Sequence, residues 1–405
     1  MPAGRTGKPS GPLNSDGQRS PTRALTFIAV LALASVLRPS VVVIGPVLPS
    51  LQADLHLGAG AAALLTTLPV LFFGIGAFAG PGLANRIGVD RGLTSAVVLL
   101  IIGSFVRLFD GSILLFIGTA VIGAGIAIGN VLLPALVRRD FPDRIGTVTG
   151  LYTSTLALSS AIAAATAVPL AGSAAAGWRV PLALWGFLAV LALLVWAPHQ
   201  WVHRHQTATH TNTPRILHLV RHSTVRSLTA YMGLQSIGFY AMVTWLPSLL
   251  QDSGTSASTA GALLSVGTVL GIPAALAVPP IAARMPQQHW IAVGTTALTA
   301  AGWAGLLVAP STMTLVWVVL LGLGTGATFP TALLLISLRS SDPSITPGLS
   351  ATVQGFGYLL AATGPFLVGI LHQGAGNWTV PLIFLLILDA LQVWAAWSAG
   401  RSDPI

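Results

Sequence analysis

Long apolar stretches recur along the chain and alternate with short polar segments. Each is about 20 residues long, the length that an α-helix needs to cross the hydrocarbon core of a bilayer. Only helices and closed barrels satisfy their backbone hydrogen bonds in lipid, and these stretches are far too long for barrel strands. The pattern therefore predicts an all-α integral membrane protein with twelve transmembrane helices. The stretches are residues 24–48, 61–83, 92–109, 112–137, 146–171, 178–198, 226–250, 257–281, 289–309, 313–337, 347–371 and 378–399.

The positive charges of the polar segments fall almost entirely on one side of the predicted bundle. Of the 19 Lys and Arg residues, all but Arg38, Arg107 and Arg179 lie on the side of the N-terminus. Cytoplasmic loops carry such an excess, so we expect a multi-pass protein of the bacterial plasma (inner) membrane with both termini in the cytoplasm. The net charge of +9 is then a topology signal, and no nucleic-acid partner is expected.

The chain also repeats itself with an offset of about half its length. The segment LPSLQAD (48–54) follows the first apolar stretch, and LPSLLQD (246–252) follows the seventh. A Gly-x-x-x-Gly pattern, which lets helices approach closely, occurs at 125–129 and again at 322–326. Two six-helix halves in parallel orientation are typical of a carrier that binds its solute between them. We expect five parts, namely a disordered cytoplasmic tail (1–23), an N-terminal six-helix bundle (24–198), a cytoplasmic linker (199–225), a C-terminal six-helix bundle (226–399) and a short cytoplasmic tail (400–405).

Five segments carry a resemblance to a known family. They are LRPSVVVIGPVLP (37–49), GNVLLPALVRRDFPDRIGTVTGLYT (129–153), GWRVPLALW (177–185), QSIGFYAMVTWLPSLL (235–250) and QGFGYLLAATGPFLVGILH (354–372). With them the chain resembles the major facilitator superfamily and, within it, the cyanate/2-nitroimidazole transporter family. The resemblance implies twelve helices in two pseudo-symmetric halves, and transport of small anionic or polar, heteroatom-rich solutes by alternating access.

The composition and the motifs argue against enzymatic chemistry. The chain has no cysteine, which excludes disulfides, thiol catalysis and Cys-based zinc sites. It has no phosphate-binding loop of the Gly-x-x-x-x-Gly-Lys type, and no nucleophile paired with a base at membrane depth. His199 and His203 have the spacing of two metal ligands on a helix but no acid or cysteine nearby. We therefore expect no enzyme, no cofactor and no metal site.

Arg38 stands in the middle of the first apolar stretch. A cation facing lipid costs at least about 2.5–3.5 kcal/mol, so its side chain should face the bundle interior or a wet cavity. Its guanidinium offers five donors in a planar fork that suits carboxylate-like anions. The alternative is that Arg38 only locks helices together, with Asp389 as its partner. Asp389, the only acid deep in an apolar stretch, is itself either a proton-coupling carboxyl or a structural acid at a helix contact.

Uncharged polar residues occur in the stretches that, by resemblance, line the central cavity of the superfamily. Their amides and hydroxyls can hydrogen-bond an anion or an azole, and their rings can stack on a planar ligand. The alternative for each is a hydrogen bond between helices. Together with the charged Arg38, the candidates for substrate binding are Asn130, Tyr152, Gln235, Tyr240, Gln354 and Tyr358.

Charged residues at the cytoplasmic ends of the stretches are candidates for gating. Ion pairs between the two halves there would hold one side of the carrier closed, and the alternative is a solvated loop that only sets topology. The candidates are Arg86, Arg139, Asp143, Arg144 and Arg339.

Together these features predict a monomeric secondary active transporter in a lipid bilayer. Its partner is a small-molecule solute, with a proton or a counter-anion as the candidate coupling ion. The alternative is a proton-coupled drug or multidrug efflux carrier of the same fold. Such carriers usually have an acid in a cavity-lining helix, and the sequence shows none.

Overall fold

The computed structural model describes residues 16–57, 59–172, 176–202, 219–401 and 405, which are helical throughout apart from short turns and contain no strand. The helices of the N-terminal half are α1 (Asp16–Leu37), α2 (Pro39–Val42), α3 (Ile44–Leu55), α4 (Ala59–Ala77), α5 (Ala79–Ile87), α6 (Val89–Val106), α7 (Ser112–Asp140), α8 (Ile145–Gly172) and α9 (Arg179–Val202). The helices of the C-terminal half are α11 (Ser223–Asp252), α12 (Ala257–Arg284), α13 (His289–Val308), α14 (Thr314–Leu338), α15 (Thr346–Ala361), α16 (Gly364–Ala375) and α17 (Thr379–Arg401).

The twelve predicted stretches all correspond to helices. Within the described residues, ten spans are long and apolar enough to cross a membrane, and the pair of helices at 68–77 and 79–87, bent by 50°, makes an eleventh. The remaining stretch coincides with α11, a 30-residue helix that is less apolar because it carries residues such as Gln235, Ser236 and Tyr240. The all-α membrane fold is therefore confirmed.

The structure describes the predicted tails and the predicted linker only in part. Helix α1 begins at Asp16, so helical structure starts inside the predicted tail, before the apolar pattern does. Residues 1–15 of that tail, 203–218 of the predicted linker and 402–404 near the C-terminus lie outside the described residues.

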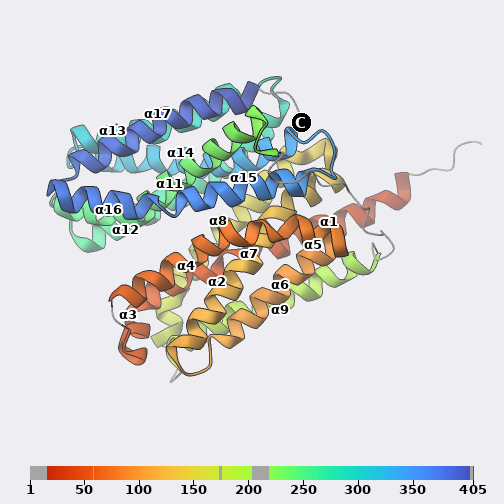
Figure 1. Ribbon diagram of the computed structural model, residues 1–405. Helices are drawn as coiled ribbons and strands as arrows, with labels where there is room; N and C mark the ends of the chain where they lie inside the picture. Colours follow the sequence, from red (N-terminus) through yellow and green to blue (C-terminus); the bar gives the residue numbers. More distant parts are fainter. Residues whose placement is uncertain (1–15, 58, 173–175, 203–218, 402–404) are drawn as a thin grey trace, which may run out of the picture.

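Figure 1 shows two bundles of helices side by side, one running from red to lime and the other from green to blue. Helix α1 begins and α17 ends at the same end of the molecule. At the opposite end, two equivalent hydrogen bonds follow the internal repeat. The Trp178 indole N–H donates to Asp54 at 2.9 Å, and the Trp378 indole N–H donates to Asp252 at 2.8 Å. The acids that end the two Leu-Pro-Ser-Leu segments thus have matching partners in the two halves.

Three spans are interrupted, and proline explains each break. Proline has no N–H and its ring clashes with the carbonyl one turn earlier. Pro39 therefore ends α1 at Leu37, Pro81 coincides with the bend between α4 and α5, and Pro365 lies just after the break between α15 and α16. Two of these breaks, at Arg38 and at Thr363, border the central cavity.

The two Gly-x-x-x-Gly patterns act as packing surfaces, as expected. Gly322 and Gly326 of α14 lie directly against the backbone of Gly267 and Gly271 of α12, where a Cβ atom would not fit. In the N-terminal half, Gly125 of α7 lies in the same way against the backbone of α6. These contacts hold neighbouring helices at backbone distance within each half.

Candidate functional site

A cavity of about 910 Å³ lies between the two halves. Residues of α2, α4 and α8 line it from the N-terminal half, and residues of α11, α12, α14, α15 and α16 line it from the C-terminal half. Most of the lining side chains are aliphatic or aromatic. Among the described residues, Arg38 is the only charged side chain that lines this cavity.

Arg38 occupies the break between α1 and α2, and its side chain is half-buried. Its guanidinium carbon lies 4.5 Å from the centre of the Phe329 ring on α14, a cation–π contact between the two halves. Within the described residues no acid forms an ion pair with Arg38. No acid among the described residues therefore neutralises the charge, and the lock with Asp389, which was the alternative interpretation of Arg38, is not formed.

Three of the four tyrosines surround Arg38. Tyr152, Tyr240 and Tyr358 each lie close enough to its guanidinium to interact with it electrostatically. Tyr240 and Tyr358 line the cavity, whereas Tyr152 is fully buried outside it. The Tyr358 hydroxyl approaches the guanidinium without reaching normal hydrogen-bond geometry, and it has no other partner within the described residues. It is therefore a donor that an anion beside Arg38 can use.

The amide candidates divide between the cavity and the contact of the halves. Gln235 lines the cavity, whereas Asn130 and Gln354 do not. Gln354 of α15 donates from Nε2 to the backbone carbonyl oxygen of Asn130 on α7 at 2.9 Å and to Ser350 Oγ at 2.7 Å. This is the hydrogen bond between helices that the sequence left open as the alternative, so here Gln354 joins the two halves.

The two halves are in close contact between the cavity and the end that holds the chain termini. A Cβ atom at Gly146 of α8 would meet the Pro279 carbonyl oxygen of α12 at 2.5 Å, and a Cβ atom at Gly150 would meet that of Leu276 at 2.7 Å. The lining residues of α8, such as Ala157, lie farther along the helix, away from this contact. The structure is therefore closed at the terminal end, and the cavity lies on the other side of this contact from the chain termini.

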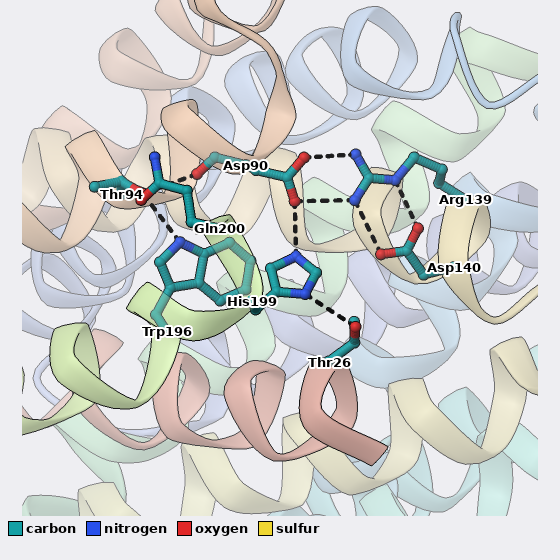
Figure 2. Close-up of polar contacts among 8 residues, drawn as sticks. All are labelled: Thr26, Asp90, Thr94, Arg139, Asp140, Trp196, His199 and Gln200. Atoms are coloured by element: carbon teal, nitrogen blue, oxygen red, sulfur yellow. Dashed lines mark hydrogen bonds and ion pairs between the residues drawn. The ribbon is translucent and has the colours of Figure 1, made fainter. Parts of the chain in front are cut away.

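A buried polar network fixes the closed end of the N-terminal half (Figure 2). Arg139 at the end of α7 binds both carboxylate oxygens of Asp90 on α6, at 2.7 and 2.9 Å, and both oxygens of Asp140, at 2.6 and 2.9 Å. His199 of α9 joins the same network, with Nε2 2.8 Å from Asp90 and Nδ1 2.9 Å from the Thr26 hydroxyl of α1. Four helices of one half are thereby tied together.

The Asp90→Asn variant is expected to lose about 3 kcal/mol of stability, because it leaves one side of a buried charge network without its partner. Thermal unfolding of the detergent-purified protein, followed by tryptophan fluorescence, measures this loss. Asp143→Asn is the matched control, since Asp143 is exposed, and it is expected to change stability by less than about 0.5 kcal/mol. Equal unfolding temperatures for the two variants would contradict the role of the network.

The gating candidates make their contacts inside one half. Arg339 donates to Gln288 Oε1 at 2.6 Å and to the carbonyl oxygens of Ala399 and Gly400, at 3.0 and 2.8 Å. It thus connects segments within the C-terminal half, as Arg139 does within the N-terminal half. The sequence offered ion pairs between the halves as the means of gating, and none is formed within the described residues. The remaining candidates are exposed side chains at the same end, namely Arg86, Asp143 and Arg144.

An electrostatic contact between the halves does exist at a pair that the sequence did not single out. Arg138 of α7 interacts with Asp342, which follows α14. Hydrogen bonds from the side chain and from the backbone N–H of Ser344, the latter at 2.7 Å, together with the charge of Arg138, hold the pKa of Asp342 below its usual value. Asp342 therefore stays negative beside Arg138 at the closed end.

Asp389 lies on α17, and it is not among the residues that line the cavity. Its side chain is buried, and Oδ2 has no hydrogen-bond partner within the described residues. One turn further, Gln392 donates to Thr296 of α13 at 3.0 Å. This placement favours the structural alternative for Asp389 over direct contact with a solute.

The charge pattern places Arg107 at the outer end of the stretch 92–109, and in the structure its side chain is fully buried. Its Nη1 donates to the Ser40 carbonyl oxygen at 2.7 Å, two residues after Arg38. Gly118 of α7 makes room for it, since a Cβ atom there would lie 2.6 Å from Arg107 Cγ. Arg107 thus holds the segment that presents Arg38. An arginine inside the last turn of an apolar stretch was the signal that could have identified it.

The sequence is similar to known proteins of one family. The sequence profile of the Major Facilitator Superfamily matches residues 25–362. An uncharacterized transporter, YycB, of Bacillus subtilis is 38% identical to this chain over 93% of each chain. The 2-nitroimidazole transporter of Escherichia coli is 36% identical over 95% of this chain and 97% of its own, and the cyanate transport protein CynX of the same organism is 31% identical over 88% and 93%.

The fold also matches solved structures. The proton:xylose symporter XylE superposes with a TM-score of 0.77 over 93% of this chain and 95% of its own, at 15% sequence identity. At that identity the match supports the arrangement of the helices alone.

Proposed function

The chain belongs to the Major Facilitator Superfamily, beside the cyanate and 2-nitroimidazole transporters, and from this premise we propose that it carries small anionic or polar, heteroatom-rich solutes with Arg38 as the anion contact. It is a transporter and not an enzyme, as its family and its relatives are. The observation that supports the proposed solute class is the single charged side chain in the cavity, which has no acidic partner among the described residues.

The direction of the cavity follows from the charge distribution. With the Arg-rich terminal end in the cytoplasm of a bacterial cell, the cavity opens to the outside of the inner membrane, and the close contact at Gly146 closes the cytoplasmic side. Alternating access then needs the contact between α8 and α12 to separate. We propose Arg138 and Asp342 as charges that bias this step, together with the gating candidates at the same end.

The alternative of a proton-coupled drug exporter receives no support from the cavity wall. No acid lines the cavity within the described chain, and Asp389 lies on α17 outside the lining. A proton or a counter-anion remains the candidate coupling ion of the proposed carrier.

Transport by purified protein in proteoliposomes tests the proposed solute class. We expect saturable uptake of cyanate, nitrate or 2-nitroimidazole above that of protein-free vesicles, and mutual competition between the solutes that are carried. Saturable uptake of hydrophobic cations alone would contradict the proposal and favour the exporter.

A further inference from the structure

We propose that the physiological ligand is an amphipathic aromatic monoanion, whose carboxylate-like head group binds Arg38 between Tyr240 and Tyr358 and whose ring lies against the apolar wall of the cavity. This inference rests on the proposed function, and it narrows the solute class from small anions in general to anions with an apolar, planar body. Four features of the cavity support this inference, namely the distribution of its hydrogen-bond donors, its aromatic wall, its single charge among the described lining residues, and its size.

Donors for an anion are concentrated at one place. Most of the other hydroxyls that line the cavity donate to a carbonyl oxygen three or four residues earlier in the chain, at 2.6–2.9 Å, and therefore present only lone pairs to a ligand. They are Thr153, Ser160, Thr268, Thr325 and Thr363. An anion placed beside them would meet acceptors and no donor.

Gln235 is committed in the same way. Its Nε2 donates to the Met232 carbonyl oxygen at 3.0 Å and to Ser236 Oγ at 2.6 Å, so both amide hydrogens are used. The guanidinium of Arg38 and the hydroxyls of Tyr240 and Tyr358 are then the donors that lie together in the cavity. A carboxylate has two oxygens and accepts several such bonds at once. The head group of the ligand is therefore expected beside Arg38, where a cation and two tyrosine hydroxyls lie together.

Aromatic rings form the wall beside this position. Phe329 lies under the guanidinium at 4.5 Å, and the Phe73 ring meets the Tyr358 ring edge to face at 5.5 Å between centres. The Phe239 ring meets Tyr240 in the same manner, at 5.4 Å. Rings in offset and edge-to-face arrangements attract a further planar ring. An aromatic body joined to the head group would thus lie against Phe73, Phe239 and Phe329.

The cavity favours one negative charge on the ligand. Arg38 is its only cation among the described lining residues, and a second carboxylate would lie in apolar surroundings without a partner. The size of the cavity excludes a good fit for a very small ion. About 910 Å³ falls in the range of sites for drug-sized ligands, and a triatomic anion would leave most of the apolar wall in contact with water.

The test compares six ligands on one purified protein. Thermal shift in detergent and competition for uptake in proteoliposomes report binding of benzoate, acetate, benzamide, terephthalate, cyanate and 2-nitroimidazole. We expect benzoate to bind at least tenfold more tightly than acetate, because its ring buries apolar area, and at least tenfold more tightly than benzamide or terephthalate, because only a monoanion matches one cation. The Tyr358→Phe variant should weaken benzoate severalfold and leave benzamide unchanged.

The outcomes separate this inference from the proposed function. If cyanate or 2-nitroimidazole is bound and carried while benzoate binds no better than acetate, the aromatic ligand is wrong and the small-anion carrier stands. Binding of benzamide or terephthalate as tight as that of benzoate would also overturn the inference. The site would then not distinguish an anion from a neutral amide, or a monoanion from a dianion. If none of the anions nor 2-nitroimidazole binds, the proposed function fails together with the inference.

Discussion

Replacement of Arg38 by methionine is expected to weaken anion binding by roughly 100-fold or more and to abolish uptake. Methionine keeps the length and the apolar contacts of the side chain but removes the cation and its five donors. Removing one partner of a buried, hydrogen-bonded charge pair costs about 2–5 kcal/mol, and each 1.4 kcal/mol is tenfold in affinity. Because no other charged side chain lines the cavity in the described chain, nothing nearby can replace it. Thermal shift with the anion panel and uptake into proteoliposomes measure the two effects.

Two further variants make this result specific. Arg38→Lys keeps the charge but loses the planar fork, so it should retain weakened binding, between the wild type and Arg38→Met. Arg91→Met removes an exposed arginine of α6 that does not line the cavity, and binding should be unchanged. If anions stabilise a folded Arg38→Met protein as strongly as the wild type, Arg38 is a structural residue and the anion site lies elsewhere.

The sequence was sufficient for the helices and for Arg38, and the reason is physical. A bilayer imposes one length and one polarity on each span, so the apolar stretches predict the helices, and a cation in such a stretch must face inward. Arg38 accordingly lies in the wall of the cavity, and Gln235, Tyr240 and Tyr358 do as well. The predictions of the helices and of Arg38 needed no knowledge of which helix packs against which, whereas the choice of Gln235, Tyr240 and Tyr358 rested on the resemblance to the superfamily.

The partners of polar residues could not be predicted in the same way. Gln354 bears the same kind of amide as Gln235, yet it donates to the backbone carbonyl oxygen of Asn130 at the contact of the halves, because their helices approach closely there. Arg139 lies close to Asp143 in sequence but binds Asp90, which is far from it in sequence and near only in the fold. A polar residue on a central helix therefore serves either the ligand or the packing, and only the arrangement of the helices decides which.

The Gly146→Leu variant is expected to lose transport by at least tenfold while the protein remains folded. The side chain would run into the backbone of Pro279 and Pro280 and into Ala283, so the close contact of α8 with α12 could not form. Overpacking of this kind costs about 1–3 kcal/mol, which shifts the balance between the two conformations about 5- to 150-fold away from the state closed at the terminal end. A carrier that rarely reaches one of its two states cannot cycle, whatever its affinity for the solute.

Access to the cavity reports this shift directly, since the chain contains no cysteine and a single one added at Val243 gives no background. Val243 lines the cavity and is exposed in the structure closed at the terminal end. A membrane-impermeant maleimide added from the side opposite the termini should label Val243→Cys several times more slowly when Gly146→Leu is also present. Gly82→Leu is the matched control, because a Cβ atom there has no neighbour within 4 Å, and it should leave labelling and transport unchanged. If Val243→Cys is labelled at the same rate with and without Gly146→Leu while transport is lost, Gly146 acts on solute binding and not on the closure of the terminal end.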